Sequence, residues 1–403
     1  MPIAWSKTEN VIWVTKLPGP GPATPIIWKD RVFVTAAETE SKKMWAICLD
    51  RSDGREIWRH EVGIGFASKN GNNGATCSPI ADGERVYFLY GTGDMLAFDM
   101  DGRIVWQRNI ERDHGKIQIG YRYGASPLLY NGRLYLTVLH RHSKVEAKPG
   151  QPEPMSYLLC IDPETGEDLW KHERKTDAVS ESMEAYTTPY PFEGQNGSLI
   201  IVAGADYVTA HDPDNGREVW RSVNLNPNRM KSYRLVPTVV SIDKMLIFYE
   251  ARGEAIFAME GDKSGQLAEE DLAWAFRENA PDVCSPLAMD GRLFVLDGRR
   301  RVMSRLDPKT GEVHWRGKLG VNKAFQASPT GADCKIYCIS MGGDVVVLSA
   351  GDTFKVLSRI DMGEGECRST IAAAYGQLFI RTAESLYCIG NKTGTESTEL
   401  DNH

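Results

Sequence analysis

Residues 161–170 read IDPETGEDLW, and four other segments repeat this pattern. They are LDRSDGREIW (49–58), FDMDGRIVW (98–106), HDPDNGREVW (211–220) and LDPKTGEVHW (306–315). In all five a glycine stands four residues before a tryptophan, and in four an aspartate stands eight residues before it. The Asp side chain can bond backbone amides in a turn, and glycine supplies a positive φ. Each segment therefore predicts a hairpin whose second strand carries tryptophan into a packed layer.

A second repeated element lies upstream of each hairpin. Examples are CSPIADGERVYFL (77–89), ASPLLYNGRLYLT (125–137) and CSPLAMDGRLFVL (284–296). Apolar and polar residues alternate on both sides of an Asp-Gly or Asn-Gly pair, which predicts strand, turn and strand. Joined to the tryptophan hairpin, this element gives four strands in every repeat. A four-stranded unit that recurs about every 40–50 residues is typical of a propeller blade.

We therefore predict that residues 1–403 form one all-β domain, an eight-bladed antiparallel β-propeller. The eighth blade, at about 367–391, lacks its outer strand, and NVIWVTKLPG (10–19) supplies it from the other end of the chain. Pairing the N-terminal strand with the C-terminal blade closes the ring and removes exposed strand edges. Residues 392–403 are expected to be a tail. The other seven blades are expected at about residues 23–62, 75–110, 124–174, 186–225, 235–279, 283–319 and 326–362.

The repeated tryptophans are interpreted as packing residues between blades, because each buries a large ring area. Leu357 takes the tryptophan position in the seventh blade, and Trp5, Trp28 and Trp45 lie outside the series. The blade-docking tryptophans are Trp13, Trp58, Trp106, Trp170, Trp220, Trp274 and Trp315.

Charge and hydropathy exclude two classes of partner. The net charge is −7 and the pI about 5.7, which argues against nucleic acid. No apolar run approaches the roughly 18 residues of a membrane span. The first residues, MPIAWSKTEN, lack the basic and apolar regions of a secretory signal, so the chain is either cytoplasmic or begins at a mature or trimmed end. We expect a monomer.

The pattern D-P-x-T-G-x-x-x-W, together with S-P-x-x-x-x-G-R-x-Y, resembles the W-motif of PQQ-like propellers from Asn10 to Asn391. That family includes quinoprotein dehydrogenases and also propellers without quinone, among them an outer-membrane assembly lipoprotein. The resemblance is to its exported bacterial members of unassigned role, so it implies a periplasmic or extracellular location. It specifies the fold more than the function, which loops would carry.

The enzymes of this family carry a vicinal Cys-Cys disulfide over the quinone and a Ca²⁺ ion held by Glu, Asn and Asp. None of the eight cysteines of this chain are adjacent. We therefore expect no bound cofactor, and PQQ with calcium belongs to the alternative function. Cys77, Cys284 and Cys367 are read as matching positions near the channel, where small residues fit, and a three-thiolate metal site is the alternative. His140 and His142 form an H-x-H pair, but no metal site is assigned.

The loops between blades gather at one face of a propeller, around its channel. Here they are rich in Tyr, Arg, Asn and Glu, which suits a protein or carbohydrate ligand. The alternative is that Arg and Glu pair with each other and close the channel mouth. The candidate ligand-binding residues are Asn72, Asn73, His114, Tyr121, Arg122, Glu184, Tyr186, Arg229, Arg234, Glu366 and Arg368.

No catalytic residue is assigned. His114, Glu181, Glu184 and Glu366 could act as acids or bases, but no catalytic motif surrounds them. The favoured function is a binding or scaffolding propeller that uses its loop face. Whether it is also an enzyme is left open, with the balance against it. The alternative is an exported PQQ-type oxidoreductase or a carbohydrate-active enzyme that uses the same face.

Overall fold

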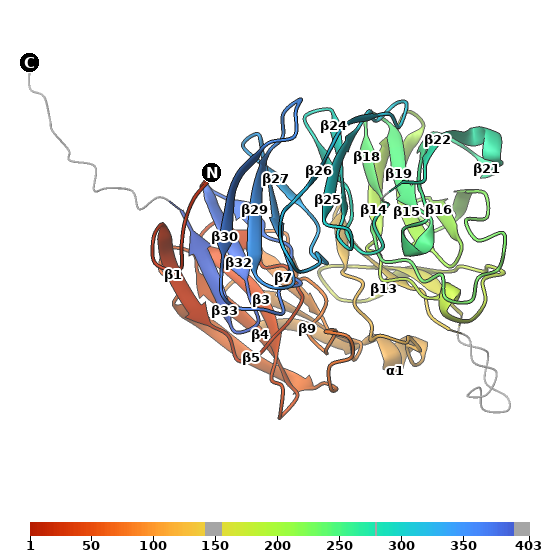
Figure 1. The fold of residues 1–403 in the computed structure, drawn as a ribbon. Helices are drawn as coiled ribbons and strands as arrows, with labels where there is room; N and C mark the ends of the chain where they lie inside the picture. Colours follow the sequence, from red (N-terminus) through yellow and green to blue (C-terminus); the bar gives the residue numbers. More distant parts are fainter. Residues whose placement is uncertain (142–154, 279, 391–403) are drawn as a thin grey trace, which may run out of the picture.

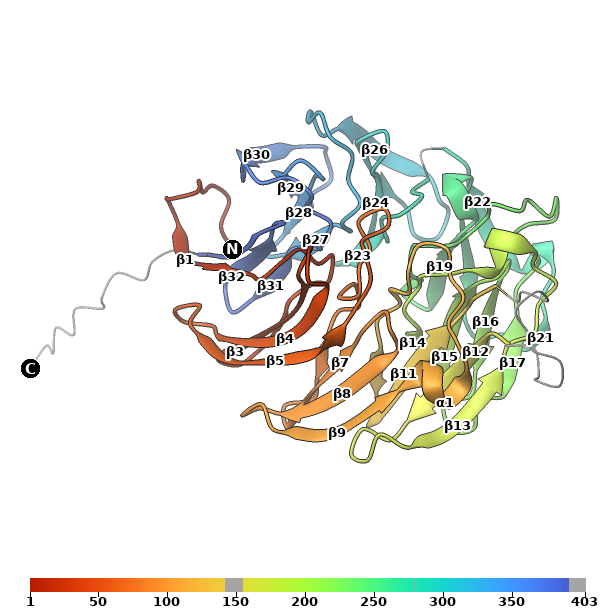
Figure 2. The ribbon, with the colours of Figure 1, turned by 90° about the horizontal axis from the view of Figure 1, so that it is seen from below.

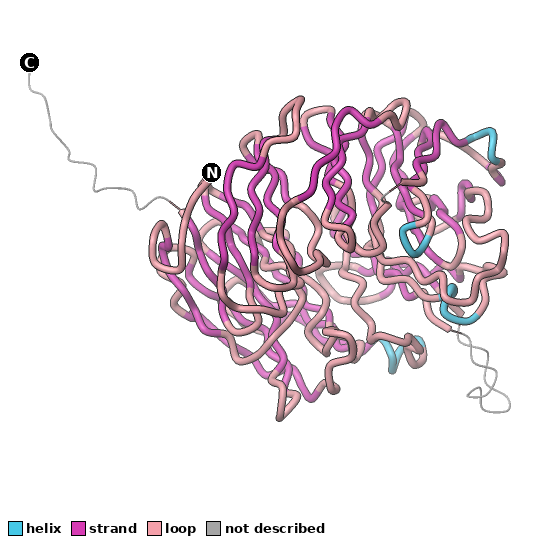
Figure 3. Tube along the Cα trace, in the orientation of Figure 1, coloured by secondary structure: helices cyan, strands magenta, loops and turns pink. Residues whose placement is uncertain are grey.

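The computed structural model describes residues 1–141, 155–278 and 280–390. Strands dominate this part of the chain (Figure 3). Its helices are the short α1 (Ile110–His114) and the 3-10 turns η1 (Ser180–Met183), η2 (Ala251–Gly253) and η3 (Glu269–Asp271). Eight sheets stand in a ring (Figure 2), which confirms the predicted eight-bladed propeller. No helix among the described residues is long and apolar enough to cross a bilayer.

Each sheet runs from a short strand at the channel to an outer strand at the perimeter, with antiparallel pairing between consecutive strands, and seven of the eight outer strands carry a tryptophan. The innermost strands are β2 (Ile26–Trp28), β6 (Ile80–Ala81), β10 (Leu128–Tyr130), β14 (Tyr190–Gly194), β18 (Val240–Ile242), β23 (Leu287–Met289), β27 (Thr330–Ala332) and β31 (Ala372–Ala374). The second strands are β3 (Arg31–Ala37), β7 (Arg85–Leu89), β11 (Arg133–Val138), β15 (Gly197–Gly204), β19 (Met245–Tyr249), β24 (Arg292–Asp297), β28 (Lys335–Ile339) and β32 (Gln377–Arg381).

The third strands are β4 (Lys43–Asp50), β8 (Asp94–Asp99), β12 (Tyr157–Ile161), β16 (Tyr207–His211), β20 (Ile256–Glu260), β25 (Val302–Leu306), β29 (Asp344–Ser349) and β33 (Ser385–Ile389). The outer strands are β5 (Glu56–Ile64), β9 (Ile104–Asn109), β13 (Asp168–Glu173), β17 (Glu218–Arg221), β22 (Leu272–Phe276), β26 (Val313–Lys318), β30 (Val356–Asp361) and β1 (Val11–Lys16).

The ring closes between the two ends of the chain, as predicted. Strand β1 pairs antiparallel with β33, so that Trp13 lies opposite Cys388 and Thr15 opposite Leu386. Figure 1 shows the red first strand beside the blue last blade. The eighth blade is thereby complete, and its outer edge is provided by the first strand of the chain.

The blades meet through one repeated contact at their outer strands. Seven indole N–H groups each donate a hydrogen bond of 2.8–3.2 Å to a backbone carbonyl in the next blade. The pairs are Trp13 with Arg51, Trp58 with Met100, Trp106 with Pro163, Trp170 with Pro213, Trp220 with Gly261, Trp274 with Pro308 and Trp315 with Gly351.

The repeated glycine explains why these rings fit. Five turn glycines have φ between +73° and +87°, and a Cβ on any of them would lie 2.5–2.8 Å from the tryptophan ring of the preceding blade. Glycine is therefore needed here for its conformation and also for its lack of a side chain. The five are Gly54, Gly102, Gly166, Gly216 and Gly311.

A second belt of contacts surrounds the channel. At the entrance to each inner strand stands a serine or threonine. At six of these positions the backbone N–H donates to the corresponding hydroxyl of the next blade at 2.9–3.2 Å. The S-P element thus has a structural purpose, which is to join neighbouring blades where their inner strands begin. These contacts run from Thr24 to Ser78, Ser78 to Ser126, Thr188 to Thr238, Thr238 to Ser285, Ser285 to Ser328 and Ser328 to Thr370.

Two parts of the fold differ from the repeat. Trp5, which lies outside the tryptophan series, is buried at the seam between the last two blades, and its Nε1 lies 3.3 Å from the sulfur of Met362. This is the seam at which Leu357 replaces tryptophan. The second is the segment 260–274, in which Gly265–Gln266 form β21, a parallel fifth strand on β17, and the following Leu267 is buried.

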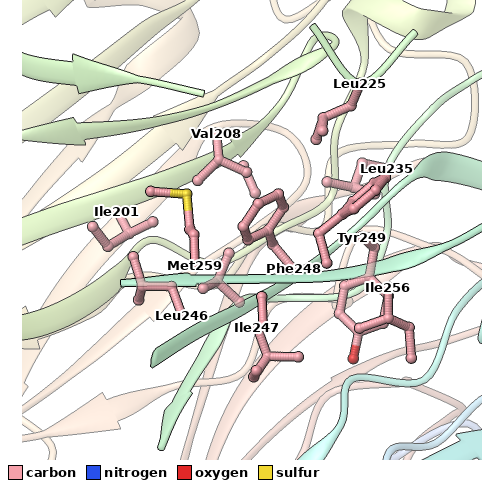
Figure 4. Close-up of a cluster of buried hydrophobic side chains, with 14 of the residues drawn as sticks. Ile201, Val208, Leu225, Leu235, Leu246, Ile247, Phe248, Tyr249, Ile256 and Met259 are labelled. Carbon is pink, nitrogen blue, oxygen red and sulfur yellow. The ribbon is translucent and has the colours of Figure 1, made fainter. Parts of the chain in front are cut away.

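Apolar side chains fill the space between blades. Figure 4 shows Ile201 and Val208 of the fourth blade together with Phe248 and Met259 of the fifth. His211 interrupts this pattern. It is fully buried and occupies a position that other repeats give to Leu, Phe or Ile, directly before the turn aspartate. Its ring nitrogens bond the Thr209 hydroxyl at 2.9 Å and the Gly216 carbonyl at 3.0 Å.

The glycine under each tryptophan can be tested by adding one methyl group. Gly166 lies against Trp106, whereas Gly132, in the same blade and with a similar positive φ, has open space around it. We expect G132A to lose about 1–2 kcal/mol of stability from left-handed backbone strain alone. G166A should lose a further 1–3 kcal/mol, roughly, because the ring must move. Urea unfolding of both variants measures the difference, and equal losses would contradict the role given to the ring contact.

His211 should make stability depend on pH. Burial lowers the pKa of His211 to about 3, well below its value in the unfolded chain. The unfolded state therefore takes up a proton that the folded state does not, and stability falls as the pH drops below about 6.5. By pH 5 this costs about 2 kcal/mol, since each pH unit is worth about 1.4 kcal/mol. H211L should lose less stability between pH 7.5 and pH 5 than the parent chain, and an unchanged difference would refute this origin.

Candidate functional site

A cavity of about 280 Å³ opens where the loops between blades meet at the channel. Every one of the eight connections between blades contributes at least one side chain or glycine to its wall. We call it the channel-mouth cavity. Its lining residues are Pro22, Asn70, Asn72, Thr76, Tyr121, Gly124, Tyr186, Arg234, Val236, Val283, Gln326 and Arg368.

Eight of these residues obey one rule of position. Each lies two residues before the serine or threonine of the inner belt, as Thr76 does before Ser78 and Arg368 before Thr370. The residue between them is small and buried in most blades, as with Cys77 and Cys284. The register of the repeat therefore decides what faces the channel. The eight are Pro22, Thr76, Gly124, Tyr186, Val236, Val283, Gln326 and Arg368.

Tyr121 and Tyr186 are held by a chain of hydrogen bonds that crosses three loops. The amide of Asn72 donates to the Tyr121 carbonyl at 3.0 Å, and the Tyr121 N–H donates to the Tyr186 hydroxyl at 3.1 Å. That hydroxyl donates in turn to Glu184 Oε2 at 3.1 Å. Glu184 is fully buried and forms an ion pair with Arg141. Burial and the adjacent Glu184 raise the pKa of the Tyr186 hydroxyl, which stays a donor to the carboxylate.

Arg234 lies on the wall between an aromatic ring and two carboxylates. Its guanidinium is 5.3 Å from the centre of the Tyr121 ring, within the range of a cation–π contact. Two carboxylates lie on its other sides, Glu181 at 3.5 Å and Asp282 at 3.9 Å. Glu181 is shared with Arg252, which approaches it to 3.2 Å.

Arg368 approaches the cavity from the opposite part of the ring, on the connection from the seventh to the eighth blade. Its Nη1 donates to the side-chain oxygen of Gln326, and its Nη2 lies 3.5 Å from the exposed carboxylate of Glu366. Its Nε is buried and has no hydrogen-bond partner among the described residues. The guanidinium also packs against Gly71, a positive-φ residue that leaves room for it.

Five of the predicted ligand-binding residues line the cavity. They are Asn72, Tyr121, Tyr186, Arg234 and Arg368. Four others lie beside it and hold its wall. Glu184 anchors Tyr186, Asn73 donates to the Pro20 carbonyl at 2.9 Å, Arg122 stacks on Phe66 at 4.3 Å, and Glu366 pairs with Arg368. The expected alternative, pairing of Arg with Glu, is therefore present around the cavity but does not fill it.

His114 and Arg229 lie away from the lining. The His114 Nε2 is 3.1 Å from Asp168, which lies on the outer strand of the third blade. Asp168 also accepts a 2.6 Å hydrogen bond from Arg108, on the outer strand of the second blade. Burial lowers the pKa of His114. Arg229 pairs with the exposed Asp177 at 3.1 Å.

Sequence reasoning missed Asn70, Thr76 and Gln326 among the polar lining residues. The last two follow the rule of two residues before the inner-belt hydroxyl, so the S-P element carried the signal for them. Asn70 lies earlier in its loop, and no repeat position marks it.

The cysteines need one correction. Cys77 and Cys284 share the position directly before the inner-belt serine, but Ser369 has that position in the eighth blade and Cys367 lies two residues earlier. All eight cysteines are free, and only Cys334 is exposed. The described residues contain no group of three or more His, Cys, Asp or Glu that could hold a metal ion. His142 of the H-x-H pair lies outside the described residues.

Comparisons with known proteins agree with the architecture. The family of "Outer membrane protein assembly factor BamB" matches residues 3–151, 154–282 and 208–384. BamB from Moraxella catarrhalis is 11% identical over 94% of this chain and 99% of its own, with a TM-score of 0.63. No curated protein sequence matches significantly.

Two similar structures belong to enzymes. A europium-containing methanol dehydrogenase is 10% identical over 94% of this chain and 93% of its own, with a TM-score of 0.68. The quinohemoprotein alcohol dehydrogenase ADHIIG from Pseudomonas putida HK5 is 12% identical over 98% of this chain and 78% of its own, with a TM-score of 0.62. Likeness at this level of identity concerns the fold.

The lining residues do not fit a quinone held with calcium. Calcium is bound by six to eight oxygen ligands, usually including carboxylates. Among the residues that the structure describes, no carboxylate lines the channel-mouth cavity, and the two charged lining residues are Arg234 and Arg368. A divalent cation placed there would be repelled by both.

The chain of bonds through Tyr186 can be tested by removing one oxygen. Y186F deletes the acceptor of the Tyr121 N–H and the donor to a buried carboxylate, so we expect a loss of about 1–3 kcal/mol. Y130F removes a hydroxyl that bonds Glu193 at an exposed site and should cost much less. Thermal unfolding of both variants provides the comparison, and a loss in Y186F no greater than in Y130F would contradict the network.

Proposed function

Because the chain belongs to the family of the outer membrane protein assembly factor BamB, we propose that it is a binding or scaffolding propeller that holds a partner at its channel-mouth cavity. One observation carries the proposal. All eight connections between blades converge on one cavity, and its wall combines two arginines, two tyrosines and several amide or hydroxyl groups. A few polar groups on a partly apolar wall are typical of a recognition site.

The chemistry of the wall disfavours the two enzyme alternatives. A PQQ-type oxidoreductase would need calcium ligands that the wall does not provide. A carbohydrate-active enzyme of the usual kind needs two carboxyl groups on either side of the scissile bond. The carboxylates next to the wall do not line the cavity. Glu181 and Asp282 lie beside Arg234, and Glu366 lies beside Arg368. Glu184 is engaged by Arg141 and Tyr186.

The family also supports a location outside the cytoplasm. Its description refers to assembly at the outer membrane, and we propose that this chain acts in the periplasm or outside the cell.

Site-specific cross-linking tests whether the loop face holds the partner. A photoreactive amino acid at Ser68, an exposed residue of the first connection, would lie beside the cavity. The same group at Asp53, exposed in a turn at the other end of an outer strand, samples the opposite face. Irradiation of native cells should give an adduct at Ser68 and none at Asp53. Equal adducts at both positions, or an adduct at Asp53 alone, would contradict the assignment.

A further inference from the structure

Among the described residues, the charged side chains that line the channel-mouth cavity are both arginines. Arg234 and Arg368 come from different parts of the ring. The chain as a whole carries a net charge of −7, whereas the charged groups that face this cavity are cationic. Its acidic neighbours, Glu181, Asp282 and Glu366, are 3.5–3.9 Å from the guanidinium groups and lie outside the lining.

Nitrogen donors near the cavity lack acceptors. The Nε of Arg368 is buried without a partner among the described residues. Behind the segment that carries Pro22, Arg381 is almost fully buried, and its Nη1 donates to the Ala23 carbonyl at 3.3 Å. Its Nε and Nη2 have no partner within the described part of the chain. Because these nitrogens are buried, they act on a ligand in the cavity through their charge and not through hydrogen bonds.

No carboxylate within the described part of the chain forms an ion pair with Arg381, so its positive charge is uncompensated there. Burial lowers the pKa of its guanidinium to about 9, which leaves it protonated at neutral pH. A charge surrounded by protein acts over a longer distance than one in water. An anion in the cavity would therefore interact with Arg381 as well as with the two lining arginines.

The rest of the wall suits a ring that carries hydroxyl groups. Gln326 and Asn70 offer amides, Thr76 offers a hydroxyl, and Tyr121 and Tyr186 provide aromatic surface. Amides can donate to and accept from a hydroxyl group. The volume of about 280 Å³ lies just below the usual size of small-molecule sites, about 300–1,000 Å³, so the ligand is small.

We propose that the channel-mouth cavity binds an acidic sugar of monosaccharide size, a uronate, whose carboxylate contacts Arg234 and Arg368 and whose hydroxyls contact the amides. Arginine is suited to this because its planar fork of N–H groups matches a carboxylate. This inference rests on the proposed function and adds the chemical class of the ligand.

Three probes separate the parts of this proposal. D-Glucuronate has both ring and carboxylate, D-glucose has the ring with a neutral group in place of the carboxylate, and acetate has the carboxylate alone. Titration followed by NMR should show binding of glucuronate that is at least about tenfold tighter than that of glucose or acetate, given the usual strength of hydrogen bonds to charged groups.

Variants of the full chain locate the site. R234Q and R368Q should each weaken glucuronate binding by about tenfold or more, and R368K, which keeps the charge but loses the fork, should weaken it less than R368Q. R103Q, a charge-matched control in an exposed turn at the other end of the outer strands, should bind like the parent chain. Melting temperatures show whether each variant is folded. If R368Q is not folded, R368K still tests the role of the guanidinium at this position.

Each alternative outcome overturns a stated part. If glucose binds as tightly as glucuronate, the proposed recognition of the carboxylate is wrong. If acetate binds as tightly as glucuronate, the proposed recognition of the sugar ring is wrong. Unchanged affinity in the folded arginine variants places the site elsewhere. If no probe binds while the Ser68 cross-link forms, the acidic sugar is wrong and the proposed function stands. If neither result is obtained, both proposals fail.

Discussion

The contact on which the ring depends is a tryptophan laid over a glycine of the next blade. The indole N–H bonds a carbonyl in that blade, and the ring covers a turn whose glycine has no side chain to displace it. Polar and apolar interactions therefore coincide at one residue pair, which is repeated around the perimeter. The inner belt of hydroxyl contacts fixes the same blades near the channel. Two concentric belts leave little freedom for a blade to tilt, so the connections between blades start from fixed positions.

This repetition is why the fold could be predicted from the sequence. The spacing from glycine to tryptophan encodes both the turn and the contact between blades, and the missing outer strand could be matched to Trp13 by its pattern. The features that the sequence did not predict occur once and are not part of the repeat. Trp5 covers the seam where Leu357 replaces tryptophan, and the added strand at Gly265–Gln266 depends on burial of Leu267. Such contacts depend on distances in space that no local pattern records.

The candidate site was only partly predictable for a related reason. Loop composition identified Tyr121, Arg234 and Arg368, but it could not separate side chains on the wall from those that support it or lie elsewhere, such as His114. A loop side chain faces the channel when it lies two residues before the serine or threonine of the inner belt. This register becomes visible only when the hydroxyl contacts of the belt are known. Once known, it can be read from the sequence in every blade, as the position of Gln326 shows.

The pairing of β1 with β33 has a consequence for how the chain is made. Synthesis proceeds from the N-terminus, so Val11–Lys16 leave the ribosome long before Ser385–Ile389, the strand they pair with. Contacts between such distant segments form late, and unpaired strand edges favour aggregation meanwhile. The first strand must wait, with an open edge, until the last blade has been translated. A stalled or truncated translation product therefore cannot close the ring.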